Sequence, residues 1–174
     1  MRKLLLLTLI SGFALNAFGN EVTCADKFRA SAAELEQSAH KLHKRSLYWL
    51  PAVFPYFHYR FIASERKHHA NHHLVFANVL DSASAYLLQK ETGQEPRTED
   101  KEYLSFFYQK ELDWFNNINI EITGVISILD RINRGSEKCP KKESHFSHGE
   151  FDWAPSPYSP FGRNIREIYL NDKL

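Results

Sequence analysis

The sequence lacks the short motifs that mark the commonest catalytic sites. No Gly-rich phosphate loop, no Gly-x-Ser-x-Gly turn and no His-Glu-x-x-His motif occurs in its 174 residues. Cys-x-x-Cys and Cys-x-x-Cys-His are also missing, which leaves a thioredoxin-like redox centre and covalently attached haem without support. Acidic and basic side chains are present, but they form no recognisable catalytic constellation. An enzyme is therefore the least supported class of function.

The sequence also lacks an excess of charge of either sign. It has 22 Lys and Arg residues against 21 Asp and Glu residues. No run of consecutive basic residues is longer than two. Non-specific binding of nucleic acid needs a clear basic excess, so we expect no nucleic-acid partner.

A long apolar run occurs only at the N-terminus. Arg2 and Lys3 precede the apolar residues 4–17, and small residues at positions 17 and 19 precede a cleavage site before Asn20. This pattern predicts a cleavable signal peptide over residues 1–19 and export to the periplasm or the extracellular space. The run is shorter than a membrane span, so we expect no transmembrane span in the mature chain. The mature chain would have 20 basic and 21 acidic residues.

Cysteine is scarce, with Cys24 and Cys139 as the two examples. In an oxidising compartment such a pair predicts one intramolecular disulfide. Two buried thiols or an intermolecular bond are the alternatives.

Apolar residues recur at helical spacing over most of the chain and predict an all-α fold. A first helix follows the capping-box-like Thr23 and ends before Pro51. A second helix runs over about 56–91, with Gly93 in the position that terminates it. A third runs over about 98–134 and is terminated by Gly135. We predict an antiparallel helical bundle of three long or four shorter helices over residues 20–135.

The disulfide and a plain three-helix bundle conflict. A helix of 30 residues is about 45 Å long, so Cys24 and Cys139 would lie at opposite ends. The few residues after Arg134 reach less than about 20 Å. We therefore favour four segments, with a break near Pro51–Pro55 or in the histidine cluster. Weak helix formers over 116–122 mark another place for a kink.

Residues 136–174 contain several prolines and show no regular period. We predict an irregular segment that is wrapped on the bundle or partly disordered. A short last helix could begin at Asn164.

Four histidines stand within six residues in the second predicted helix. A helical projection places Glu65, His68, His69 and His72 on the side of the apolar stripe, with pairs one turn apart. Such pairs can bind Zn²⁺, Cu²⁺ or Ni²⁺. One helix supplies only two or three ligands, so we favour a structural role over a metal site. Further ligands would have to come from the residues His58, Glu111, His145 and His148. A di-iron bundle would need a second Glu-x-x-His, which the sequence does not have.

Residues 46–62 form the most aromatic stretch, interrupted by two prolines. We favour a kinked connection that plugs one end of the core. The alternative is a surface for a protein partner or a membrane interface, built from the residues Tyr48, Trp49, Phe54, Tyr56 and Phe57. The stretch is too interrupted and too charged to be a good membrane span.

Two functions from different classes remain. The first is an exported, non-catalytic interaction protein, such as an inhibitor, an immunity protein or a chaperone-like binder. The second is a transition-metal-binding helical protein that uses the histidine cluster. No cofactor follows from the sequence with certainty.

Overall fold

The computed structural model describes residues 22–140 and 160–174. The predicted signal peptide, His145 and His148 lie outside these residues. The described chain is all helical and contains no strand, as the periodicity predicted. Its helices are α1 (Cys24–Leu47), α2 (Val53–Glu91), α3 (Thr98–Lys110), α4 (Leu112–Asn117), α5 (Ile122–Asn133) and α6 (Pro160–Asn171).

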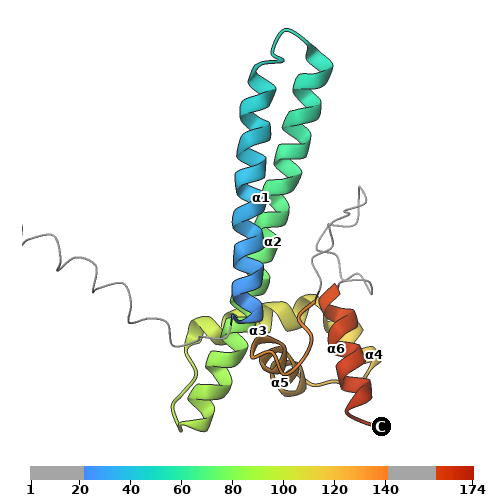
Figure 1. The fold of residues 1–174 in the computed structure, drawn as a ribbon. Coiled ribbons are helices and arrows are strands. Elements are labelled where there is room, and N and C mark those ends of the chain that lie inside the picture. The colour runs from blue at the N-terminus through green and yellow to red at the C-terminus, as the bar shows by residue number, and fades with distance from the viewer. Residues whose placement is uncertain (1–21, 141–159) are drawn as a thin grey trace, which may run out of the picture.

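Helices α1 and α2 form a long antiparallel hairpin that projects from the rest of the molecule (Figure 1). We call residues 24–80 the arm and the remaining described helical residues the base. At about 1.5 Å per residue, the 24 residues of α1 make the arm about 36 Å long. The predicted capping box opens α1, since the Thr23 side chain accepts from the Asp26 backbone and Asp26 accepts from the Thr23 backbone.

The two helices of the arm meet along a seam of small residues. Buried small side chains recur every seven residues on each helix, and they are Ala25, Ala32, Ala39 and Ser46 on α1 and Ala63, Ala70 and Ala77 on α2. A seven-residue spacing keeps one face of each helix against its neighbour, as in a coiled coil. Small side chains on both sides let the two backbones approach closely. The arm is therefore held by close contact along its length rather than by a thick apolar core.

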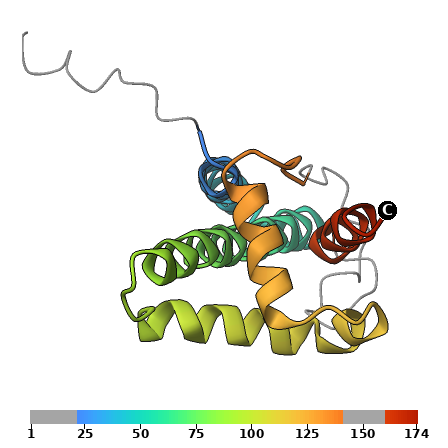
Figure 2. The ribbon, with the colours of Figure 1, turned by 90° about the horizontal axis from the view of Figure 1, so that it is seen from below.

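The base holds the large apolar side chains. Helix α5 crosses α2 and reaches α3, and α6 packs beside α5 (Figure 2). The largest fully buried side chains lie here, and they include Phe107, Phe115, Leu129, Ile132 and Ile165. Leu80 on α2 is buried in the same cluster, so the C-terminal part of α2 belongs to this core. Arm and base thus share one long helix.

The predicted helix that breaks is the third, over about residues 98–134, and not the second. Helix α2 is continuous through the histidine cluster, and our preferred break at Pro51–Pro55 is the turn between α1 and α2. Asn119 adopts a positive φ of 54° after α4. The Ile120 N–H donates to Phe115 O and the Asn119 N–H donates to Asn116 O, which is a Schellman ending with Asn in the left-handed position.

The break explains how the two cysteines meet. After it, α5 runs back across the base, so that its end lies near the start of α1. The Cys24–Cys139 disulfide joins these points, with the Cα atoms 5.6 Å apart. The prediction of the disulfide is confirmed in the structure, and the argument that a helix must break for it was sound. The position that we preferred for the break was wrong, because α2 is continuous and the third predicted helix divides into α3, α4 and α5.

Asn133, which is only 3% exposed, joins three helices next to the disulfide. Its Oδ1 accepts from the Ala25 N–H at the start of α1, at 3.0 Å. Its Nδ2 donates to Leu80 O, Asp81 Oδ1 and Ser84 Oγ on α2. The arm is therefore fixed to α5 by hydrogen bonds as well as by a covalent bond.

The end of the segment predicted to be irregular contains a helix. In α6, Ile165 and Ile168 are buried against the base. Arg131 on α5 donates to both carboxylate oxygens of Asp172, at 2.7 and 3.2 Å. Apolar contact and this ion pair together dock α6 on α5.

Candidate functional site

The far end of the arm carries a patch of exposed apolar side chains, which we call the apolar tip. Its members are Leu47, Tyr48, Trp49, Leu50, Val53, Phe54 and Phe57. Tyr48 is 84% exposed, Phe54 82% and Trp49 45%. Isolated apolar residues on a surface are common, but a contiguous patch of this kind usually marks a contact site.

The turn at the tip is an ordered structure. Successive backbone N–H groups of Tyr48, Trp49 and Leu50 donate to carbonyls three residues earlier, so the last turn of α1 tightens. The Ala52 N–H then donates to Trp49 O at 2.8 Å, which closes the turn before α2. Because these four backbone N–H groups are paired, this turn can present apolar side chains outward at a defined place.

The expectation that this aromatic stretch plugs the core is wrong. Tyr48, Trp49, Phe54 and Phe57 are exposed, and Tyr56 is half-buried. The core lies at the opposite end of α2, where the base helices surround it. An arm of two helices has no third element at its tip that could cover these rings among the described residues.

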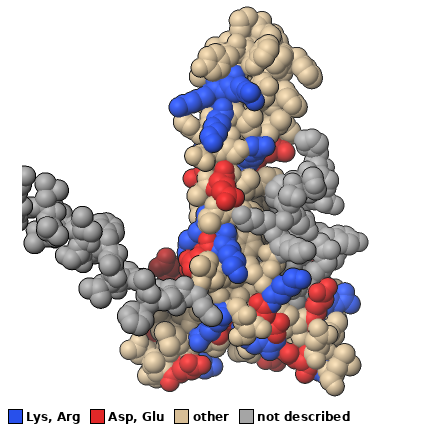
Figure 3. Space-filling view, in the orientation of Figure 1, with Lys and Arg blue, Asp and Glu red and all other residues tan. Residues whose placement is uncertain are grey.

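Just below the tip lies a group of cationic side chains, which we call the basic collar. It consists of Lys41, Lys44, Arg45 and Arg60, which are all exposed. Residues 37–64 contain no Asp or Glu. Figure 3 shows the end of the arm free of acidic side chains on this face, with Lys and Arg directly beneath it. The charge of the whole chain is near neutral, but the far end of the arm is basic and apolar.

Aromatic rings hold two members of the collar in place. The Arg45 guanidinium lies 5.9 Å from the centre of the Tyr59 ring, and that of Arg60 lies 5.9 Å from the centre of the Tyr56 ring. Arg60 also approaches His43 Nδ1 at 3.2 Å across the arm. The sequence analysis did not identify the collar, although the lack of acidic residues over positions 37–64 is visible in the sequence.

The histidine cluster divides between two faces of α2. His69 and His73 are buried against α1, where the His73 ring meets Phe28 edge-on at 5.4 Å. His68 is exposed and His72 half-buried, and their Nε2 atoms lie 2.9 Å apart. The predicted one-turn pairing of His68 with His72 is therefore present.

The electrostatics of the cluster follow from its burial. The pKa of His72 is lowered to about 4. Burial is the main cause, and the neighbouring His68, His69 and His73 contribute in the same direction. Burial also lowers the pKa of His69, while the nearby Glu65 carboxylate opposes this. His72 is therefore neutral at pH 7.

The described residues contain no group of three or more His, Cys, Asp or Glu side chains placed to hold a metal ion. His68 and His72 come together, whereas Glu65 and His69 do not join them in such a group. His58 stacks on Phe54 near the tip, with ring centres 6.3 Å apart. Glu111 is buried at the kink between α3 and α4 and does not snorkel to solvent. Two imidazoles are what the described chain offers to a metal.

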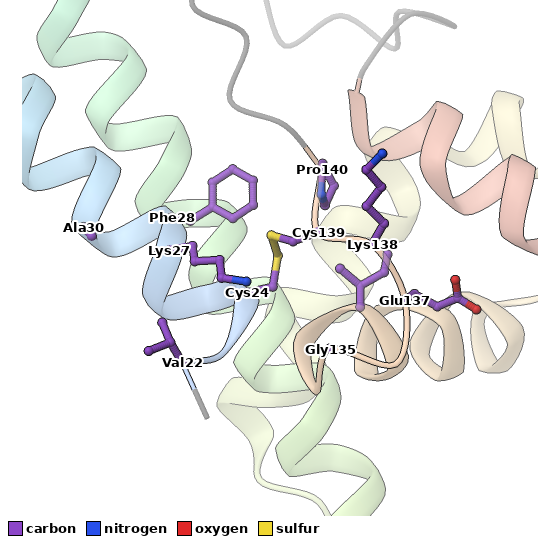
Figure 4. A pocket seen from close by; sticks show the side chains of 11 residues that line it. Val22, Cys24, Lys27, Phe28, Ala30, Gly135, Glu137, Lys138, Cys139 and Pro140 are labelled. Atoms are coloured by element: carbon purple, nitrogen blue, oxygen red, sulfur yellow. A yellow bond between two sulfur atoms is a disulfide. The ribbon is translucent and has the colours of Figure 1, made fainter. Parts of the chain in front are cut away.

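An open hollow lies beside the disulfide at the root of the arm (Figure 4). Phe28 and Lys27 on α1 and Glu137 and Lys138 after α5 line it, with the disulfide at its floor. Val22 and Pro140 also border the hollow. Its acidic lining residue, Glu137, accepts a hydrogen bond from Arg131 at 2.9 Å.

Compared with known proteins, the chain matches no family model, no curated protein and no solved structure. No helix among the described residues is both long enough and apolar enough to cross a membrane. Inference about function therefore depends on the tip, the collar and the histidines.

Proposed function

We propose that this chain is an exported, non-catalytic interaction protein whose arm presents the apolar tip to a partner. The proposal rests chiefly on one observation, the exposure of Tyr48, Trp49, Phe54 and Phe57 on an ordered turn far from the core. Leaving large apolar side chains in water forfeits about 1.5–3 kcal/mol for each one that could be buried. A surface that carries several such side chains is suited to burying them against something else.

The arm is also suited to this role mechanically. The disulfide, Asn133 and the ion pair between Arg29 and Asp81 fix its root to the base. A rigid presentation reduces the conformational entropy that is lost on binding. No known catalytic motif in the sequence competes with this reading.

A photo-crosslinking amino acid at position 54 tests the proposal. The full chain with this residue is produced in its native host and irradiated there. We expect covalent adducts from position 54 and far fewer from position 106, since Phe106 is an exposed phenylalanine on the base. Equal yields at the two positions, or none at position 54, would contradict a role for the tip.

A transition-metal-binding role is the second candidate, and the His68–His72 pair favours it. The two Nε2 atoms are 2.9 Å apart. Two imidazoles on a tetrahedral Zn²⁺, at about 2.0–2.1 Å each, would be about 3.3 Å apart, so a small side-chain movement would suffice. Because the pKa of His72 is lowered to about 4, its imidazole is neutral at pH 7, which is the form that binds a metal ion.

Calorimetric titration with Zn²⁺ and Ni²⁺ tests this candidate. His68→Ala/His72→Ala should lose binding that His40→Ala/His43→Ala, a control pair exposed on α1, retains. Wild-type protein that binds neither metal below the micromolar range would leave the histidines with a structural role.

A further inference from the structure

We infer that the partner of the arm is an anionic lipid surface, into which the apolar tip inserts while the basic collar binds the headgroups. This inference rests on the proposed function and names the partner of the same site. It follows from the distribution of side chains along the arm, with apolar and aromatic side chains together at the end and basic side chains behind them.

The composition of the tip matches a membrane interface better than a protein interface. The aliphatic and phenyl side chains of Leu50, Val53 and Phe54 are all exposed at the tip. Tyr and Trp are the residues that concentrate at the boundary between headgroups and acyl chains, because their rings are apolar and carry one polar atom. Tyr48 and Trp49 adjoin the aliphatic residues of the turn.

The charge of the arm selects the kind of lipid. The basic collar has four cationic side chains and residues 37–64 have no acidic one. A negative bilayer surface attracts each nearby Lys or Arg, and acidic side chains in the same place would oppose this attraction. Long cationic side chains can also extend along the arm, so that the charge remains among the headgroups while the tip is inserted.

A hollow behind the tip adds a place for a headgroup phosphate. His40, His43, Arg60 and Lys67 line it, together with Glu36. Arg60 lies across it from α2 against the His43 ring on α1. Cationic and imidazole groups from both helices of the arm therefore line one hollow, in which Glu36 is the acidic member.

The geometry allows shallow insertion without a transmembrane helix. The turn at residues 48–52 is short. The exposed side chains of the apolar tip lie at the end of α1, in this turn and on the first residues of α2. Peripheral proteins bury such side chains about 5–10 Å into the interface. The base, at the other end of an arm about 36 Å long, would then stand clear of the bilayer.

Vesicle flotation with the full chain tests the inference. The probes are vesicles of phosphatidylcholine alone and vesicles that also contain phosphatidylglycerol. We expect binding to the anionic vesicles, weaker binding to the neutral ones and release at high salt. Phe54→Ser should weaken anionic binding about tenfold or more, whereas Phe106→Ser, the matched change on the base, should not. Lys41→Gln/Lys44→Gln should weaken it about tenfold, while Lys27→Gln/Lys90→Gln should not.

Brominated lipids give a positional reading of the same event. They should quench Trp49 fluorescence, and Trp49→Phe should remove the quenching while vesicle binding is retained, because Phe is also apolar. Circular dichroism and melting temperature of each variant show whether it has folded, so that loss of binding reflects the surface itself.

The outcomes separate this inference from the proposed function. Binding to anionic vesicles that tip and collar variants lose supports both. No vesicle binding, together with a protein adduct from position 54, overturns the lipid inference and leaves the interaction function standing. An adduct to a second copy of the chain has the same meaning. No vesicle binding and no adduct overturns both, and vesicle binding that Phe54→Ser leaves unchanged overturns the insertion of the tip.

Discussion

The Asn133 side chain joins α5 to both helices of the arm by hydrogen bonds. It accepts from Ala25 and donates to three acceptors on α2 while buried. We expect Asn133→Ala to lower the free energy of unfolding by about 2–4 kcal/mol, because several buried polar groups would lose their partner together. Urea unfolding followed by circular dichroism measures this. Asn116→Ala, an exposed change on α4, should stay within about 0.5 kcal/mol, and an equal effect at both positions would contradict the assigned role.

His72 should make stability depend on pH. Its pKa in the folded chain is about 4, below the value of about 6.5 for an unfolded histidine. Between these values the unfolded chain binds more protons, so stability is fully present above about pH 6.5 and falls as the pH drops toward 4. We expect a loss of about 1–2 kcal/mol after allowance for the partial exposure of the ring. Urea unfolding at pH 7.5 and at pH 4.5 measures this difference in the free energy of unfolding. His72→Gln should reduce the difference, and the change His40→Gln at an exposed position is the control.

At the scale of elements, the seam of the arm sets a limit on side-chain size. Ala70 is fully buried between α1 and α2. We expect Ala70→Leu to destabilise the chain by about 1–3 kcal/mol, because the larger side chain would force the helices apart. Its neighbour Asn71 is exposed, so Asn71→Leu should cost little and controls for helix propensity. Chemical unfolding of both variants would decide the point, and a tolerated Ala70→Leu would show that the helices do not need close approach.

Helix ends could be predicted because local chemistry determines them. Thr23 and Asp26 form the expected capping box, and Gly93 and Gly135 take the positive φ that ends α2 and α5. The break at Asn119 was visible only as weak helix propensity. What fixes it is the burial of Ile120 in a core to which α2, α3 and α5 contribute, and a single helical segment gives no information on that.

The two candidate sites show the same difference. The projection of α2 correctly brought His68 and His72 together, since they share one helix. It also placed all four histidines toward the core, whereas α1 covers only the side of His69 and His73. For the aromatic stretch, ring content alone suggested burial. The outcome depends on whether a third element reaches the end of the arm, and that is a property of the tertiary arrangement.

At the scale of the whole molecule, the disulfide should contribute much of the stability. It closes a loop with a sequence separation of 115 residues. In the chain-entropy picture a loop of this size is worth about 4–5 kcal/mol. We expect Cys24→Ser/Cys139→Ser to lower the urea midpoint accordingly, and reduced wild-type protein to match the double variant. A reduced protein as stable as the oxidised one would show that Asn133 and the core suffice to hold the arm.

The same bond decides which parts of the chain can carry tension. When the two ends of the polypeptide are pulled apart, the covalent path runs through Cys24 and Cys139 and omits everything between them. The arm and most of the base lie within the loop that the disulfide closes, and they then bear no load. Reduction would return the 115-residue interval to the path and add about 400 Å of contour length in a single-molecule stretching experiment. Force applied at the tip takes a different path, because the tip lies inside the loop that the disulfide closes. Such a force passes along α1 and α2 to the root of the arm.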